Sequence, residues 1–406
     1  MTILFFPSAP INGGTFDLSS SNSNFSVCQL NPNKFLAVYR QNNPNLTLAQ
    51  VVNIIDKNTV TFGNIWVVNT INVIFTSIVV KKIKGTTNKA LLICADEPTC
   101  KLYTQILTVD SNDDISASPF STFVEPFSNQ INLMNVISFD SYNNRMVINF
   151  NYDYNNSNYF FSRKILINTT ANTVTIITNG FGGQSNEFYG SYQDDIDSNN
   201  DQYCVIVRKN NLSKFTILKR NFPGLDSTTM YSNPDVITTI LKGDINAVPA
   251  GNIRRISNII RLQNFLYFTI NSGTTSTAND TLCEFNLNTN TETFYTLTGS
   301  RNFVNLEKVD NYHYAEVQNN ISTNPIGTDM KMRVFKILLP GILESPYNPI
   351  TVLPSQSGQF RSNYRSQSSP LVYFTNLNKN TFFISSNLFC YFYKTSENYR
   401  VALLHD

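Results

Sequence analysis

Short apolar segments recur along this chain at a nearly regular interval, and each is followed by a polar turn and a second apolar segment. The first three intervals are each about 55 residues long, and all of them lie between roughly 47 and 70 residues. A recurrence of this length is typical of a four-stranded unit that packs against copies of itself. The clearest copies begin at seven residues: Phe35, Ala90, Met146, Tyr203, Phe265, Tyr312 and Phe382.

The residue composition favours strands over helices. Hydrophobic residues make up 41% of the chain and aromatic residues 13%, and aromatic side chains suit strands. Gly, Pro, Asn and Asp gather at the joints between the apolar segments, which is typical of short strands joined by turns. No amphipathic helix longer than about two turns is present. We therefore expect an all-β protein.

The polar turns divide the repeat into four-stranded antiparallel blades. Turns at residues 56–59, 110–114 and 168–172 fall at matching places, between the third and fourth strands of three successive units. Residues 25–406 are predicted to form one domain of about seven blades, and the last of them would use strands at 371–375, 381–385, 388–393 and 400–404. Six or eight blades, or a pair of β-sandwiches, stay open as alternatives.

The first 24 residues are left over from this repeat. Residues 3–6 could add an edge strand to the last blade, whereas residues 7–23 are rich in Ser, Gly and Asn and could form an arm that docks on a neighbouring subunit. Two further stretches, 223–251 and 340–370, are poorly patterned. Long irregular stretches in compact domains are often functional, so we expect contacts with partners there.

The charge balance excludes several classes of protein. Charged residues are only 14% of the chain and the net charge is +2, so we expect no nucleic-acid partner. Lys81, Lys82 and Lys84 form the densest basic cluster, and we interpret it as part of a strand. The chain shows neither a signal peptide nor a long apolar segment. We expect no membrane insertion.

Residues suited to catalysis are sparse. The two histidines, His313 and His405, are accompanied by no nucleophile motif, and no Cys or His pair has metal-ligand spacing. We therefore predict no catalytic, cofactor-binding or metal-binding residues, and no cofactor. A pair of carboxylates, as in glycosidases, stays open. Its candidates lie near the predicted inner strands: Asp96, Glu97, Glu187 and Glu316.

Three other features have both a functional and a simpler interpretation. The acidic run from Asp195 to Asp201 and the turn at 110–114 resemble calcium loops, but Asn200 and Ile206 stand where Gly and Glu would be expected. We interpret both as solvated turns. The Gly-rich residues 180–183 precede no helix, so a blade-to-blade connection is the better interpretation. Trp66, at a strand end, is expected in the core or at the rim.

The six cysteines lie mostly in apolar segments, where Cys acts as a small hydrophobic side chain. They are Cys28, Cys94, Cys100, Cys204, Cys283 and Cys390. Cys94 and Cys100 flank a turn and could form a disulfide across a hairpin. Reduced thiols are the expected state, and whether that pair is bonded stays open.

Taken together, the repeat resembles the β-propeller superfold over nearly the whole chain, most closely with seven blades. The signature motifs of WD40, kelch, YWTD and sialidase-type blades are absent. The Asn-rich, weakly charged surface and the sparse catalytic groups look like viral or phage structural propellers. This resemblance implies a non-enzymatic scaffold of a virion, assembled in the host cytoplasm and used for assembly or host attachment. Its partners would be other protein subunits, including copies of itself.

A carbohydrate-binding propeller is the main alternative. In such a lectin or adhesin, exposed Tyr and Asn at equivalent loops would contact a glycan receptor. A propeller glycosidase, using the carboxylates named above, is the third possibility.

Overall fold

The computed structural model describes the backbone of 34 strands and the turns between many of them. Side chains are described at residues 26–40, 46–56, 59–68, 75, 78–83, 85–96, 99, 101–123, 165–175, 217, 260–268 and 282–295. Within these parts of the chain every regular element is a strand, and the strands form seven antiparallel sheets. The prediction of an all-β protein is confirmed.

The first three sheets follow one another along the chain. Blade one contains β3 (Phe25–Asn31), β4 (Lys34–Asn42), β5 (Asn45–Asp56), β6 (Thr59–Phe62) and β7 (Trp66–Val67). Blade two contains β8 (Ser77–Lys82), β9 (Lys89–Asp96), β10 (Lys101–Val109), β11 (Ile115–Ala117) and β12 (Ser121–Val124). Blade three contains β13 (Ile131–Asp140), β14 (Arg145–Tyr154), β15 (Ser157–Asn168), β16 (Thr173–Ile177) and β17 (Gly182–Gln184).

The remaining sheets continue the same order. Blade four contains β18 (Phe188–Gln193), β19 (Asp201–Arg208), β20 (Asn211–Asn221) and β21 (Thr238–Asp244). Blade five contains β22 (Ile253–Ile256), β23 (Ile260–Leu262), β24 (Phe265–Ser272), β25 (Asp280–Asn286) and β26 (Thr291–Thr296). Blade six contains β27 (Asn302–Lys308), β28 (His313–Asn319), β29 (Met330–Leu339), β30 (Ile342–Glu344) and β31 (Ile350–Leu353). Blade seven contains β32 (Thr381–Ser385), β33 (Leu388–Lys394), β34 (Asn398–His405), β1 (Leu4–Phe5) and β2 (Ala9–Thr15).

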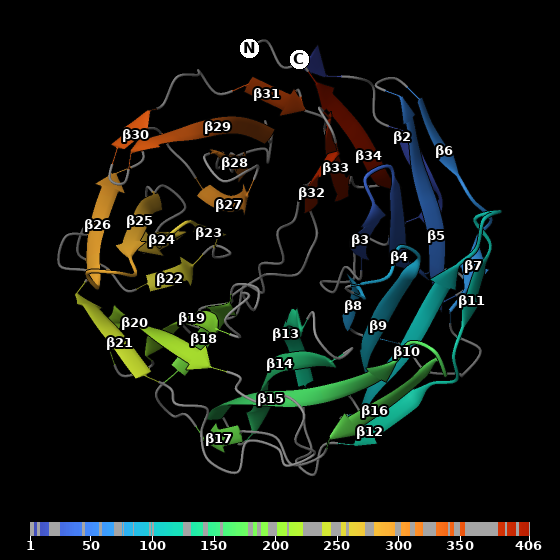
Figure 1. Ribbon diagram of the computed structural model, residues 1–406, viewed down its shortest axis with the longest axis horizontal. Helices are drawn as coiled ribbons and strands as arrows, with labels where there is room; N and C mark the ends of the chain where they lie inside the picture. The colour runs from blue at the N-terminus through green and yellow to red at the C-terminus, as the bar shows by residue number, and fades with distance from the viewer. Residues whose placement is uncertain are drawn as a thin grey trace.

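The seven sheets stand around a ring, with the first strand of each blade nearest the centre and the fourth at the rim (Figure 1). The described strands of blades one to six follow an up-and-down order in their sheets, with the parts of a divided strand pairing to the same neighbour. Strands of adjacent blades contact one another, as β3 and β4 do with β8. This arrangement is a β-propeller, as the repeat predicted.

The fourth strand of several blades is broken, although the sequence predicted a continuous one in blades one and two. In blade one the break lies at residues 63–65, between β6 and β7, and Gln50 Nε2 donates to the Gly63 carbonyl at 2.9 Å. In blade two Gln105 Nε2 donates in the same way to Ser118, at 2.6 Å. Both glutamine side chains are buried on the third strand. A buried amide thus binds the outer strand where the backbone ladder is interrupted.

Blade seven joins segments from both ends of the chain. β32 is the innermost of its described strands, and the pairing continues outward through β33 to β34 (Figure 1). The outer position belongs to β1 and β2, which both pair with β34. Segments from the two ends of the chain therefore share one sheet, and β2 also contacts β4 and β6 of blade one. The predicted strand at 371–375 lies outside the described residues.

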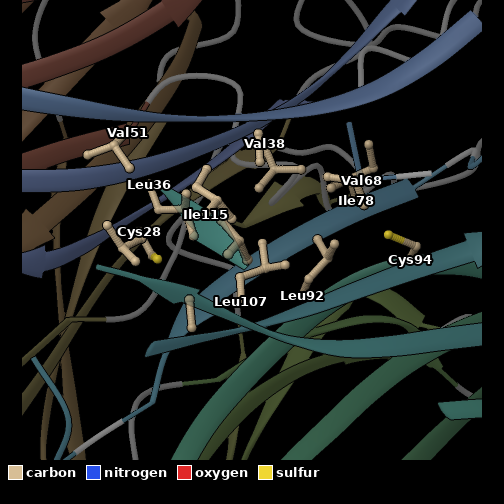
Figure 2. Packing of buried hydrophobic residues seen from close by; sticks show 14 of the residues in the cluster. Cys28, Leu36, Val38, Val51, Val68, Ile78, Leu92, Cys94, Leu107 and Ile115 are labelled. Carbon is tan, nitrogen blue, oxygen red and sulfur yellow. The ribbon is translucent and has the colours of Figure 1, made fainter. Parts of the chain in front are cut away.

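An apolar cluster fills the seam between blades one and two. Leu36, Val38 and Val51 of blade one face Leu92 and Leu107 of blade two, and all five side chains are fully buried (Figure 2). Complete burial of each such side chain contributes about 1.5–3 kcal/mol. The seam holds the two blades at a fixed mutual position because a packed interior tolerates little rearrangement.

Three aromatic rings close one part of the same cluster. The Phe75 ring lies 5.3 Å from the Tyr103 ring and 6.0 Å from the Phe120 ring, measured between centroids. Tyr103 and Phe120 meet edge to face at 5.9 Å, a favourable arrangement for aromatic pairs. Phe75 precedes the first strand of blade two, so this contact fixes where the chain enters that blade.

Candidate functional site

The acidic turn at residues 110–114 is a hydrogen-bonded turn between β10 and β11. The Asp110 carboxylate accepts the backbone N–H groups of Asn112 at 2.8 Å and Asp114 at 2.9 Å. Asp113 lies in the left-handed region, at φ 66°, which Asp tolerates better than most residues. This local structure aims the Asp113 and Asp114 side chains at blade one.

Both carboxylates bind donors from the neighbouring blade. Asp113 forms an ion pair with Lys34, the first residue of β4, and accepts a second hydrogen bond from Asn53 Nδ2 at 2.5 Å. Asp114 accepts from Asn64 Nδ2 at 2.9 Å. The turn that resembled a short calcium loop therefore joins blade two to blade one through protein donors.

The seam between blades two and three repeats this contact. Lys89, the first residue of β9, donates to the Thr169 carbonyl at 2.5 Å and to Asn172 Oδ1 at 2.6 Å. Asn172 lies in the left-handed region, at φ 52°, like its counterpart Asp113. Ser121 Oγ adds a bond to the Val174 carbonyl at 2.7 Å. We call these two contacts, Lys34–Asp113 and Lys89–Asn172, the blade latches.

The candidate carboxylates of the glycosidase hypothesis are only partly described. Asp96 ends β9, is buried, and accepts a hydrogen bond from Thr99 Oγ1 across the connection to β10. Glu316 lies in β28, whose backbone alone is described. Glu97 and Glu187 lie outside the described residues, as does the run 195–200. For Asp96 the structure shows a role in holding a turn.

A buried carboxylate that the sequence analysis missed lies in blade five. Glu284 of β25 is 3% exposed and stands directly opposite Tyr267 of β24. Tyr267 Oη donates to Glu284 Oε2 at 2.7 Å, and Tyr295 Oη lies 3.4 Å from Glu284 Oε1. A charged residue within the apolar segment 282–285 was the signal that could have revealed it.

The carboxylate changes the acidity of both tyrosines. Burial, a hydrogen bond to Glu284 and its negative charge raise the pKa of Tyr267 well above its ordinary value. Burial and the Glu284 charge raise the pKa of Tyr295 to about 12. Both hydroxyls therefore stay protonated at neutral pH and act as hydrogen-bond donors, which a buried carboxylate requires.

Most of the other residues that the sequence analysis considered lie in strands or at strand ends. His313 begins β28 and pairs with Lys336, whereas His405 ends β34. Trp66 is half-buried and packs against the apolar cluster of blades one and two. Lys81 and Lys82 are half-buried in β8. Of the Gly-rich residues 180–183, the last two belong to β17.

The described cysteines are buried free thiols. Cys94 is unbonded, as are Cys28 and Cys283. Burial raises the pKa of Cys28 to about 12 and raises the pKa of Cys94 and Cys283 well above the ordinary value. These thiols are held in the unreactive protonated form. Cys100, the other half of the suggested disulfide, lies outside the described residues.

The described residues contain neither a metal-binding cluster nor a membrane-spanning helix. Among them, no group of three or more His, Cys, Asp or Glu side chains is close enough to hold a metal ion. In the same part of the chain, no helix is long and apolar enough to cross a membrane.

Comparison with known proteins supports the fold. No protein-family model and no curated protein sequence matches the chain. Among solved structures, S. cerevisiae core factor is similar with a TM-score of 0.51 and 13% identity, covering 100% of this chain and 62% of that chain. Polysaccharide lyase Uly1 is similar with a TM-score of 0.50 and 6% identity, covering 92% and 88%. Sqt1 from Chaetomium thermophilum has a TM-score of 0.48 and 9% identity, covering 98% and 100%. At these identities the likeness concerns the fold alone, and the chain is a β-propeller.

Proposed function

We propose that this propeller is a non-enzymatic interaction protein that holds partner-binding loops on a rigid ring. The proposal rests on the contacts that three described carboxylates make. Asp113 binds Lys34, Asp96 binds Thr99, and Glu284 lies with two tyrosines. Each is engaged in holding strands or blades together, which supports a scaffold role over carboxylate-pair catalysis.

The partner is proposed to bind the face opposite the blade latches. The latches involve the turns between third and fourth strands, so these turns are already engaged in contacts between blades. The opposite face carries the connections from second to third strands and from each blade to the next. One of the longest of these joins β28, which ends at Asn319, to β29, which begins at Met330, in blade six. Long connections in compact domains are often functional.

The specific setting that we propose is a virion, where the propeller serves assembly or host attachment. Support comes from the composition: 14% charged residues, and a chain rich in neutral polar side chains. The same composition suits protein subunits as partners. Neither the setting nor the partner follows from the fold, which serves many functions.

The test compares two variants for incorporation into particles from the source culture. In the first, residues 320–329 are replaced by Asn-Gly, a short hairpin turn. In the matched control, Thr289→Ala changes an exposed turn residue on the latch face. We expect the loop variant to lose incorporation and the control to retain it, with both showing the same circular dichroism. Equal incorporation of both variants would contradict the proposed face.

Two further assays distinguish the other functions. A glycan array probed with the intact protein tests the lectin alternative, and a panel of glycosides tests hydrolysis. Hydrolysis that disappears in Glu316→Gln would overturn the non-enzymatic proposal, whereas a specific glycan signal without particle incorporation would replace the protein partner by a carbohydrate.

A further inference from the structure

The outer edge of β34 is occupied by chain that comes from the opposite end of the sequence. β33 and β34 pair through seven consecutive residues, from Leu388 opposite His405 to Lys394 opposite Tyr399. Among the described strands, β1 and β2 are the ones that pair with its other side. No hairpin turn links them to β34, and the described contacts of the segment are its pairing with β34 and the packing of β2 against blade one.

The pairing of this occupant with β34 is short and interrupted. Leu4 and Phe5 pair with His405 and Leu404, and then Ala9 resumes the pairing opposite Val401. The register shifts between Pro10 and Thr15. Pro10 stands at a paired position but has no N–H to donate. The outer strand of blade three is also divided, between β16 and β17, but β16 pairs through five consecutive residues.

Without this segment, the outer edge of β34 would be free to pair with another strand. Residues 401–404 of β34 read Val-Ala-Leu-Leu, an apolar run in the middle of an eight-residue strand. An uncovered apolar edge strand readily pairs with another extended chain. The occupant whose backbone register already fits this edge is the same segment from a second copy.

The connection to blade one allows such an exchange. Residues 16–24, between β2 and β3, are mostly Ser and Asn and can span at most roughly 30 Å when extended. A segment on a tether of this length can reach an adjacent copy, and a swapped pair forms the same strand contacts as a closed monomer. Concentration then decides between the two forms.

We propose that the β34 edge is a strand-acceptor site that accepts residues 4–15 of a second copy of this chain, linking subunits by strand exchange. This inference concerns the two ends of the chain and holds whichever partner the loops bind. It predicts that the protein forms concentration-dependent oligomers in which the outer strand of blade seven comes from a neighbour.

The test uses two full-length versions of different mass. One carries Leu4→Cys and the other carries His405→Cys, two positions that are directly opposite in the sheet. After mixing and mild oxidation, a disulfide between positions 4 and 405 of different chains forms only if the strand has exchanged. We expect this linked heterodimer, identified by peptide mass spectrometry, to increase with protein concentration.

One further cysteine pair measures the background of chance linking, and another repeats the exchange test at a neighbouring position. Tyr393→Cys and Arg400→Cys, placed in separate chains, are opposite each other within the β33–β34 hairpin and should link only by chance collision. Phe5→Cys with Leu404→Cys is a second exchange pair. If neither exchange pair links different chains above the hairpin background at any concentration, the proposal is wrong.

Discussion

Gly63 of blade one lies close to Asp113 of blade two. A Cβ atom added there would lie 3.0 Å from Asp113 Cβ, 3.0 Å from the Asp113 carbonyl oxygen and 3.2 Å from Val51 Cβ. A side chain in this break of the outer strand would therefore press against the turn that carries the blade latch. The equivalent position in blade two is Ser118, whose hydroxyl accepts the Ile106 N–H at 3.0 Å. Equivalent positions of the repeat have thus diverged to suit different neighbours.

We expect Gly63→Ala to lower the free energy of unfolding by about 1–3 kcal/mol, the usual cost of overpacking. Urea denaturation measures this loss in the free energy of unfolding. In an Asp113→Gly background the penalty should shrink, because one of the close atoms is gone and Gly suits the φ of 66° at that position. An unchanged penalty would mean that the contact with Asp113 is not its cause.

The tyrosines around Glu284 predict a dependence of stability on pH. Their pKa values are raised in the folded protein, to about 12 for Tyr295, above an unfolded value of about 10. Their contribution is therefore fully present below about pH 10 and is lost as the pH rises toward the folded value. Tyr295→Phe should reduce the fall in stability between about pH 9 and about pH 11, measured by urea unfolding.

If stability fell equally with pH in the wild type and in Tyr295→Phe, Tyr295 would not be the cause of the fall. An ultraviolet titration of tyrosinate gives an independent check, since Tyr295→Phe should remove a component that titrates near pH 12.

At the level of structural elements, the blade latches could not be predicted from the sequence, although the strands and turns that contain their residues could. The turns at 110–114 and 168–172 follow from local chemistry, because Asp and Asn suit tight turns. That Lys34 reaches Asp113 depends on how neighbouring blades pack, and no local pattern encodes a contact between such distant residues. For Glu284 the sequence carried a local signal, a charge within an apolar segment, but its partner Tyr267 on another strand could not be predicted.

The two latches offer a matched comparison. Lys34→Met removes the cation that pairs with the Asp113 carboxylate, whereas Lys89→Met removes a donor to a neutral amide and to a carbonyl. We expect Lys34→Met to cost about 1–2 kcal/mol, and more than Lys89→Met, because charged groups make the stronger hydrogen bonds. A double-mutant cycle with Asp113→Asn isolates the pair. A coupling energy near zero would show that the latch does not stabilise the ring.

For the whole molecule, the repeat length and turn positions were enough to predict a ring of about seven blades. The closure of that ring was predicted in part: residues 3–6 were suggested as an edge strand of the last blade, and β1 pairs with β34 there, whereas the pairing of β2 was not predicted. The structure assigns β32 to the centre and the segments β1 and β2 to the rim. Pairing between opposite ends of a chain carries no periodic signal, since each segment reads as an ordinary short strand.

A closed ring should unfold as one unit, because each blade is supported on both sides. Trp66, the only tryptophan, lies in blade one and packs against the seam with blade two. Its fluorescence reports on that seam, whereas circular dichroism reports on all strands. We expect the two denaturation curves to coincide. A fluorescence transition at lower denaturant concentration would show that blade one separates first.

The sharing of blade seven between β34 and the segments β1 and β2 also has a consequence for the order of events during synthesis. Residues 4–15 leave the ribosome before any of the blades, yet the strand that they pair with is made last. Blades one to six can each assemble from contiguous chain as it emerges. Residues 4–15 cannot make this contact until β34 of blade seven has been synthesised, and contacts of such long sequence separation form slowly. We therefore expect closure of the ring to be the slow last step of folding. On a polysome, where several chains are made side by side, residues 4–15 of one chain can meet the newly synthesised β34 of another.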